Sequence, residues 1–102
     1  MNEKGILTLL GFAQKAGNIS AGDAAVENFV KKGRTKLLIL SSEFSESRRD
    51  YWIKQAADYG IECIELEITK HDLGLAVGMS PRGVIGVLDQ NMADAVVKKM
   101  KE

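Results

Sequence analysis

Two short runs of apolar residues limit most strongly what this chain of 102 residues can fold into. Leu37–Leu40 and Val84–Leu88 contain only aliphatic residues and one glycine. Runs of this length are too short for a membrane span and have the length of β-strands. Because neither strand has a polar face, each must be covered on both sides. The two runs therefore predict central strands that lie between two layers of other structure.

Segments with helical periodicity surround these strands. A helix capped by Asn2 is expected to end at Ala16–Asn18. The remaining helices are predicted over Asp23–Lys32, over Glu46–Tyr59, from Thr69 to about Val77, and from Asp89 onwards. On the helix that starts at Asp23, the apolar stripe is predicted to consist of Ala25, Val26, Phe29 and Val30.

Two further extended segments complete the predicted sheet. Ile19–Ser20 is a short link, and Ile61–Ile68 alternates apolar and acidic residues, as a strand with one wet side does. Helices that connect strands cover the faces of the sheet. We therefore expect an α/β protein, a three-layer α/β/α sandwich with a four-stranded mixed sheet. Residues 1–102 are expected to form it as a single domain.

The composition excludes several classes of protein. With Cys63 as the one cysteine, no disulfide framework can form, and a reducing, cytoplasmic location is expected. Cys63 and the single His71 are a poor ligand set for a metal ion. The residues after Met1 do not form a signal peptide, and no apolar run approaches the roughly 20 residues of a membrane span. We expect no metal, no cofactor and no membrane contact.

Catalytic motifs are also absent from the sequence. GxSxG, HExxH, CxxC and GxxxxGK[ST] do not occur. His71 beside Asp72 could be a general base held by a carboxylate, but its place in the first turn of a predicted helix favours an exposed turn residue. Nothing near Cys63 in the sequence would lower its pKa. The sequence thus predicts no catalytic residue, no small-molecule substrate and no enzymatic activity.

Charged residues are unevenly distributed, although the formal net charge of the chain is zero. Residues 4–36 carry six basic and two acidic side chains, whereas residues 58–72 carry five acidic and one basic. This pattern indicates a basic face and an acidic face. A basic face concentrates phosphate-bearing partners, but two solvated faces without a partner would give the same pattern.

Two segments combine the features of an anion-binding surface. Ser20–Lys36 places Gly22 at the start of a predicted helix, where free backbone N–H groups attract phosphates. The second segment, Leu73–Val87, joins a short helix to a buried strand by a loop that contains Met79 and Arg82. We expect the two segments to form one surface, which consists of a helix N-terminus, an apolar loop and a guanidinium.

Three groups of residues, in this order along the chain, carry a resemblance to a known family. They are Leu9–Gly17 with Ser20-Ala21-Gly22, the run Lys32–Ser42, and Leu73-Gly74-x-Ala76-x-Gly78 followed by Arg82 and a strand. With them the chain resembles the kink-turn RNA-binding ribosomal protein superfamily, which includes the large-subunit proteins seven-Ae and thirty-e. The resemblance is greatest to the small bacterial YlxQ-like branch. It implies an α/β/α sandwich that binds ribosomal or other structured RNA, with ribosomal proteins as further partners.

In that family, the start of the second helix and the loop before the last strand contact RNA. The helix start has the pattern Gly-x-Asn-Glu-x-x-Lys, in which the Asn and Glu side chains read guanine edges. Gly22 keeps the glycine, but Ala24, Ala25 and Asn28 replace the Asn, Glu and Lys. Alanine has no hydrogen-bonding side chain, so this readout is lost. Binding through amides and phosphates needs no base-reading side chain and is still expected, whereas tight kink-turn recognition cannot come from these side chains.

The residues expected to contact RNA come from both segments. The carboxylate of Asp23 would repel phosphate unless it is turned aside or used as a cap. The expected contacts are the amides of Gly22, Asp23 and Ala24, the side-chain amide of Asn28, the cations of Lys32, Lys36 and Arg82 on phosphates, and apolar contacts from Met79 and Val84.

A protein-interaction module on the same fold is the alternative function. Ala24, Ala25 and the loop around Met79 would then present an uncharged patch to a protein partner. The two functions differ in the surface charge around Gly22 and Arg82. A continuous basic field there favours RNA, and a flat apolar patch favours protein.

Overall fold

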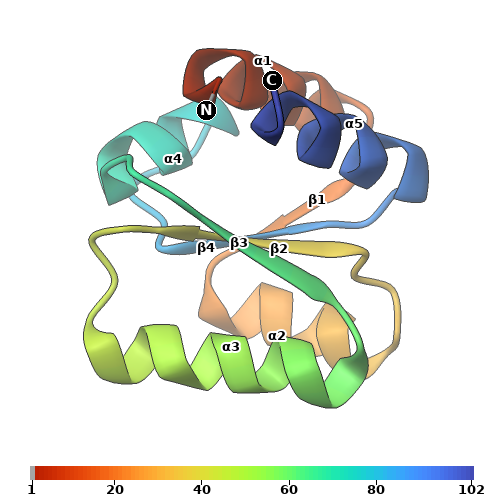
Figure 1. Ribbon diagram of the computed structural model, residues 1–102, viewed down its shortest axis with the longest axis vertical. Coiled ribbons are helices and arrows are strands. Elements are labelled where there is room, and N and C mark those ends of the chain that lie inside the picture. Colours follow the sequence, from red (N-terminus) through yellow and green to blue (C-terminus); the bar gives the residue numbers. More distant parts are fainter. Residues whose placement is uncertain (1) are drawn as a thin grey trace.

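The structure, a computed structural model, describes residues 2–102. Helices and strands alternate along the whole chain (Figure 1). Their order is α1 (Glu3–Lys15), β1 (Ile19–Ala21), α2 (Asp23–Lys31), β2 (Leu37–Ser41), α3 (Glu46–Tyr59), β3 (Glu62–Leu66), α4 (Lys70–Ala76), β4 (Val84–Val87) and α5 (Gln90–Met100).

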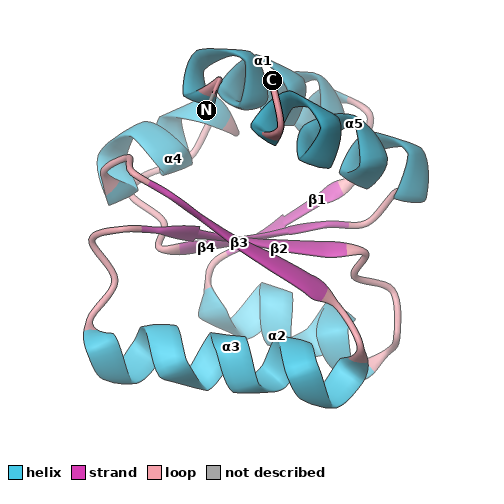
Figure 2. Ribbon diagram, viewed as in Figure 1, coloured by secondary structure: helices cyan, strands magenta, loops and turns pink. Residues whose placement is uncertain are grey.

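The four strands form one mixed sheet in the order β1-β4-β2-β3. β2 and β3 are parallel, whereas β4 is antiparallel to both β1 and β2. Helices α1, α4 and α5 cover one face of the sheet, and α2 and α3 cover the other (Figures 1 and 2). The predicted three-layer α/β/α sandwich with a four-stranded mixed sheet is therefore confirmed. Every residue of the two central strands, β2 and β4, is buried, as their apolar sequences require.

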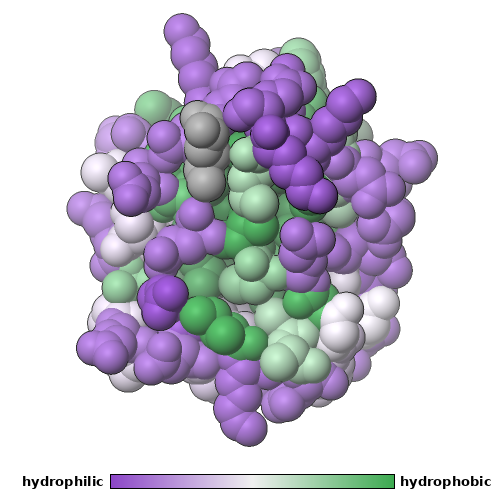
Figure 3. Space-filling view, in the orientation of Figure 1, coloured by the Kyte–Doolittle hydropathy of each residue, from purple (hydrophilic) through white to green (hydrophobic). Residues whose placement is uncertain are grey.

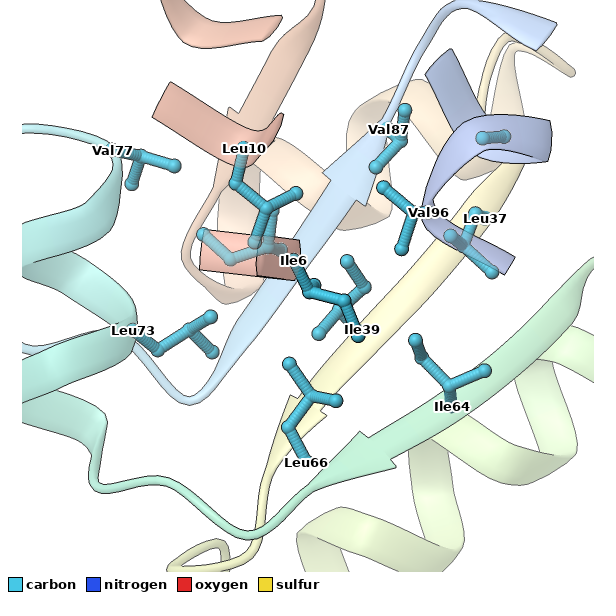
Figure 4. Close-up of a cluster of buried hydrophobic side chains, with 12 residues drawn as sticks. Ile6, Leu10, Leu37, Ile39, Ile64, Leu66, Leu73, Val77, Val87 and Val96 are labelled. Carbon is cyan, nitrogen blue, oxygen red and sulfur yellow. The ribbon is translucent and has the colours of Figure 1, made fainter. Parts of the chain in front are cut away.

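Each face of the sheet packs against its helices through its own apolar cluster. Below α1, α4 and α5, side chains such as Ile6, Leu10 and Leu73 meet Ile39 of β2 (Figure 4). On the other face, Val26 and Val30 of α2 and Trp52 of α3 pack against β2 and β4. Trp52 is fully buried.

Four of the five helices begin with a side-chain cap. Asn2, Ser45, Thr69 and Asp89 each accept a hydrogen bond from the backbone N–H three residues later. Such caps satisfy one of the free N–H groups of the first turn. Helix α2 differs because its N-cap residue is Gly22, which has no side chain to offer.

The structure corrects several boundaries and faces. The strand expected over Ile61–Ile68 is shorter, because the N–H groups of Ile61 and Ile68 bond to Ala56 and Leu66 in the turns on either side. The strand predicted at Leu37–Leu40 is one residue longer, because the N–H of Ser41 bonds to the carbonyl of Gly83. Ala25 does not belong to the apolar stripe of α2. Its side chain is exposed, and Val26 and Val30 bury that helix instead.

Strand β3 lies at one edge of the sheet, and its outer side pairs with no other strand among residues 2–102. The face seen in Figure 3 shows hydrophobic residues gathered in the middle, where Figure 1 places this strand, within a hydrophilic rim. Glu62 and Glu65 of this strand and the following Glu67 are exposed. Charged side chains along an open edge oppose pairing with another strand. Within residues 2–102, no helix is both long enough and apolar enough to cross a membrane.

We predict that Gly74→Ala destabilises the fold by about 2 kcal/mol, the usual cost of overpacking. A Cβ at this buried position of α4 would overlap the carbonyl oxygen of Ser80 and lie 2.8 Å from its carbonyl carbon. Backbone atoms cannot rotate away, so the loop before β4 would have to move. Urea unfolding gives the free energy of unfolding, with His71→Ala on the exposed side of the same helix as control. Equal stability of the two variants would contradict the prediction.

Candidate nucleic-acid interface

The start of α2 and the loop before β4 lie side by side, as the sequence predicts. The N–H of Gly22 donates a hydrogen bond of 3.0 Å to the carbonyl of Val84. A Cβ on Gly22 would lie 3.3 Å from Nε and 3.4 Å from Cδ of Arg82. Gly22 also has φ of +88°, which side chains other than glycine adopt only with strain. The positive φ favours glycine at this position, and its missing Cβ leaves room for the side chain of Arg82.

Backbone amides are open at the start of α2. Within residues 2–102, the N–H groups of Asp23, Ala24 and Ala25 have no hydrogen-bond acceptor, and no side chain caps the helix. These donors and the positive end of the helix dipole favour an anion. The expectation that Gly22 offers its amide is wrong, because that N–H is bonded to Val84. The open donors begin one residue later than the sequence suggested.

The carboxylate of Asp23 points to α3 rather than across the helix start. Its Oδ1 accepts hydrogen bonds from Nη2 of Arg48 at 2.7 Å and from Nε1 of Trp52 at 3.0 Å. Burial alone would raise the pKa of Asp23. The hydrogen bonds from Arg48 and Trp52 and the charges of Arg48 and Lys70 outweigh this effect, so the pKa lies below its ordinary value. Asp23 is ionised and turned aside, one of the two arrangements expected for it.

Two cations that sequence reasoning missed also lie at this place. The carbonyl of Lys70, the first residue of α4, accepts the N–H of Arg82 at 3.0 Å, and Arg48 of α3 is paired with Asp23. We call Arg48, Lys70 and Arg82, which surround the start of α2, the basic corner. The three residues come from two helices and a loop, so no local motif joins them. Only the sheet order brings them together.

Arg82 is held in place by its own loop. Its Nη1 donates to Oγ of Ser80 at 2.6 Å and to the carbonyls of Ser80 and Pro81, both at 3.1 Å. The guanidinium is half-buried and keeps other donors free. In the same loop, the side chain of Met79 is 40% exposed, which suits the apolar contact predicted for it.

Phe44 links the basic corner to the sheet. A Cβ on Gly83 would overlap the ring of Phe44, so the aromatic ring lies directly on the loop before β4. The ammonium of Lys70 lies 5.3 Å from the centroid of the same ring, a cation–π contact. Lys70 and the loop that carries Arg82 therefore share one support.

Carboxylates border the basic corner on one side. Glu43 accepts a hydrogen bond of 2.7 Å from the backbone N–H of Lys70. Glu43, Glu67 and Asp72 also line a surface pocket of about 380 Å³ beside the start of α4. Lys70 and Arg82 therefore lie between the ion pair of Arg48 and Asp23 on one side and the carboxylates of this pocket on the other.

Three of the expected contact residues do not lie at the corner. Val84 is fully buried in the cluster below α2 and α3, so its side chain cannot touch a ligand, and that expectation is wrong.

Lys32 ends α2, whose nine residues span about 13 Å at 1.5 Å per residue. The N–H of Lys36 bonds to Val87, at the opposite end of β4 from Val84. Lys32 and Lys36 are exposed but lie at the far end of α2. Asn28 is exposed in the same helix, one turn beyond Ala24.

The two candidate catalytic residues, His71 and Cys63, lie on different elements, α4 and β3. His71 is exposed in the first turn of α4. Burial, followed by the charge of Glu65, raises the pKa of the Cys63 thiol to about 11. A thiol with so high a pKa is a poor nucleophile at neutral pH. Among residues 2–102, no group of three or more His, Cys, Asp or Glu side chains is placed to hold a metal ion.

The arrangement of helices on both faces of a mixed β1-β4-β2-β3 sheet places the chain among α/β/α sandwich proteins. Residues 4–97 match the family described as Ribosomal protein L7Ae/L30e/S12e/Gadd45 family, and the chain belongs to this family. The resemblance found in the sequence is thereby confirmed at the level of the family. Membership of the YlxQ-like branch stays a prediction.

Individual relatives agree with this assignment. The chain is 22% identical over 98 residues to the large ribosomal subunit protein eL8 of Picrophilus torridus, with 96% of this chain and 77% of that protein covered. A protein with unknown function from Bacillus halodurans has a TM-score of 0.88 and 29% identity, with 95% and 97% of the chains covered. The 15.5kD RNA binding protein of Giardia lamblia has a TM-score of 0.75, 18% identity and coverages of 93% and 81%, a likeness of fold.

We predict that Cys63 reacts with iodoacetamide at pH 8 at least tenfold more slowly than free cysteine, because little of the buried thiol is ionised. The rate should rise with pH toward about 11, the value set by burial and Glu65. Mass spectrometry of samples quenched at successive times measures the rate at which iodoacetamide alkylates Cys63. A rate equal to that of free cysteine at pH 8 would show that the thiol is not shielded as the structure describes.

Proposed function

We propose that this protein is a cytoplasmic, non-enzymatic RNA-binding protein that associates with ribosomes and contacts structured RNA through the start of α2 and the loop before β4. The observation that carries the proposal is the contact of Arg82 with Gly22, which sets a guanidinium beside the open amides of Asp23 and Ala24. Amides and a guanidinium at one place are the groups that bind RNA phosphates in proteins. Residues 1–102 would act as a single RNA-binding domain.

The relatives support the same function. One of them is a ribosomal protein, another is named an RNA binding protein, and the family model is named for ribosomal proteins. No group of catalytic side chains was found in the sequence, and the cations of the basic corner serve binding rather than bond cleavage. Ribosomal proteins are the natural further partners of a chain of this family.

The geometry supports the following proposed contacts. A phosphate would bind at the amides of Asp23 and Ala24, with Arg82 and Lys70 beside it. The side-chain amide of Asn28 extends the contact along the exposed face of α2, and Met79 supplies an apolar contact from the loop. Lys32 and Lys36 would reach only a second part of a larger RNA, because they lie at the far end of the helix.

Base selectivity should be weak at this surface. Ala24 and Ala25 are exposed beside the open amides, so the positions that read bases in the family would face the RNA without donors or acceptors. The RNA is then recognised by backbone shape and phosphate positions. Each lost base contact removes on the order of 1–3 kcal/mol of discrimination.

The alternative, a protein-interaction module, has less support from the surface. Ala24, Ala25 and Met79 are exposed, as that function requires, but the cations of the basic corner lie beside them. Charged groups around a small apolar patch favour an anionic partner. Binding of an apolar peptide without any binding of RNA would support the alternative.

We predict that Arg82→Gln weakens binding to a kink-turn RNA and to a plain duplex by a similar factor. It should reduce the slope of log K against log salt by about one, because one phosphate contact is lost. Fluorescence anisotropy over a salt titration measures both quantities. Lys98→Gln, a change of the same charge on exposed α5, is the control and should leave the slope unchanged. A wild-type affinity that does not vary with salt would refute phosphate binding.

We also predict that the triple variant Ala24→Asn, Ala25→Glu, Asn28→Lys prefers the kink-turn RNA over the duplex by about tenfold more than the wild type does. The three exposed positions would regain the donors and acceptors of the family pattern, and one good base contact supplies discrimination of this size. Asn28→Lys alone adds a charge but no base contact, so it should strengthen binding to both RNAs. An unchanged preference in the triple variant would mean that these positions do not face the RNA.

A further inference from the structure

A carboxylate lies among the cations of the basic corner, where an RNA-binding surface would be expected to avoid one. Asp23 follows Gly22, which contacts Arg82, and the charge of Lys70 acts on the same carboxylate. An ionised carboxylate beside a bound phosphate repels it. The direction of the Asp23 side chain therefore decides how much of the corner is open to RNA.

Two donors on α3 fix that direction. Trp52 is fully buried, so its indole N–H needs a partner within the protein. It donates a hydrogen bond of 3.0 Å to Oδ1 of Asp23. Arg48 donates to the same oxygen at 2.7 Å and neutralises its charge. Both Arg48 and Trp52 lie on one face of α3, separated by one helical turn.

Arg48 is itself held in position from α2. Its guanidinium lies 4.7 Å from the centroid of the Tyr51 ring, and the hydroxyl of Tyr51 donates to Oε1 of Glu27 on α2. The Tyr51 and Trp52 rings meet edge to face at 5.2 Å. The chain of contacts from Glu27 through Tyr51 and Arg48 to Asp23 starts and ends on α2, so it closes a ring between the two helices.

We propose that Arg48 is a positioning residue of the RNA interface, which holds the carboxylate of Asp23 on α3 and neutralises it so that Lys70 and Arg82 stay open to phosphates. This inference rests on the proposed function. One face of the Arg48 guanidinium is covered by Tyr51 and its Nη2 is bonded to Asp23, while the side chain as a whole is 42% exposed. A direct phosphate contact by Arg48 is the competing role.

A double-mutant cycle separates the two roles. Arg48→Met keeps a side chain of similar length on Tyr51 without the charge, and Asp23→Asn keeps an acceptor for Trp52 without the carboxylate. The probe is the kink-turn RNA at fixed salt, with anisotropy as readout. We expect Arg48→Met to weaken binding about fivefold in the wild type, because it uncovers a like charge beside the phosphates, and less than twofold in the Asp23→Asn background.

The other outcomes are decisive as well. Equal weakening by Arg48→Met in both backgrounds would show that Arg48 contacts phosphate directly and would overturn the proposal. No weakening in either background would also overturn it. If the wild type binds neither the kink-turn RNA nor the duplex, the proposed function fails. This outcome differs from a double-mutant cycle in which both RNAs bind but Arg48 and Asp23 show no coupling. Far-UV circular dichroism of each variant confirms folding, and NMR titration should show a higher pKa of Asp23 in Arg48→Met, since its main hydrogen-bond donor is gone.

Discussion

The hydrogen bond from the N–H of Gly22 to the carbonyl of Val84 fixes the geometry on which the candidate interface depends. It ties the residue before α2 to the first residue of β4, a central strand that is buried along its whole length. A helix start that is anchored to the core cannot shift relative to the sheet without breaking buried contacts. The open amides of α2 and the guanidinium of Arg82 are therefore presented in one fixed arrangement.

Specific contacts hold three cationic side chains, which are far apart in the sequence, at one corner of the structure. Arg48, Lys70 and Arg82 come from three separate segments, yet each is held by a specific contact: with Asp23, with the ring of Phe44, and with the loop residues Ser80 and Pro81. Lys70 and Arg82 are therefore prearranged, and prearranged cations lose less conformational entropy when a ligand binds. The zero net charge of the chain is thus compatible with a local positive field at one corner.

The fold could be predicted from the sequence because its signals are local. The apolar runs at 37–40 and 84–88 required two covered faces, and Asn2, Ser45, Thr69 and Asp89 are side-chain caps at positions that the periodicity also indicated. The prediction of Ala25 in the core failed, because small residues fit either a buried or an exposed position and the periodicity of one short helix does not decide between them.

The site could be predicted only in part. The proximity of Gly22 and Arg82 could be predicted because a glycine at a helix start and an arginine in a loop are recognisable in sequence order. Lys70 and Arg48 were missed because their proximity is a result of strand order, which the residues around them do not encode. The bonded amide of Gly22 follows from the pairing of β4 with β1, a long-range contact. The burial of Val84 agrees with the apolar run at 84–88, which already indicated a strand covered on both faces.

Trp52 is the single tryptophan of the chain, and its indole N–H is bonded to Asp23, the first residue of α2. The ring is buried in the cluster below α2 and α3, while its polar edge meets the surface network. Indole emission responds to both the packing of the ring and the charge near its N–H. The protein therefore carries an intrinsic optical reporter at the boundary between its core and its candidate ligand surface, and no label has to be attached there.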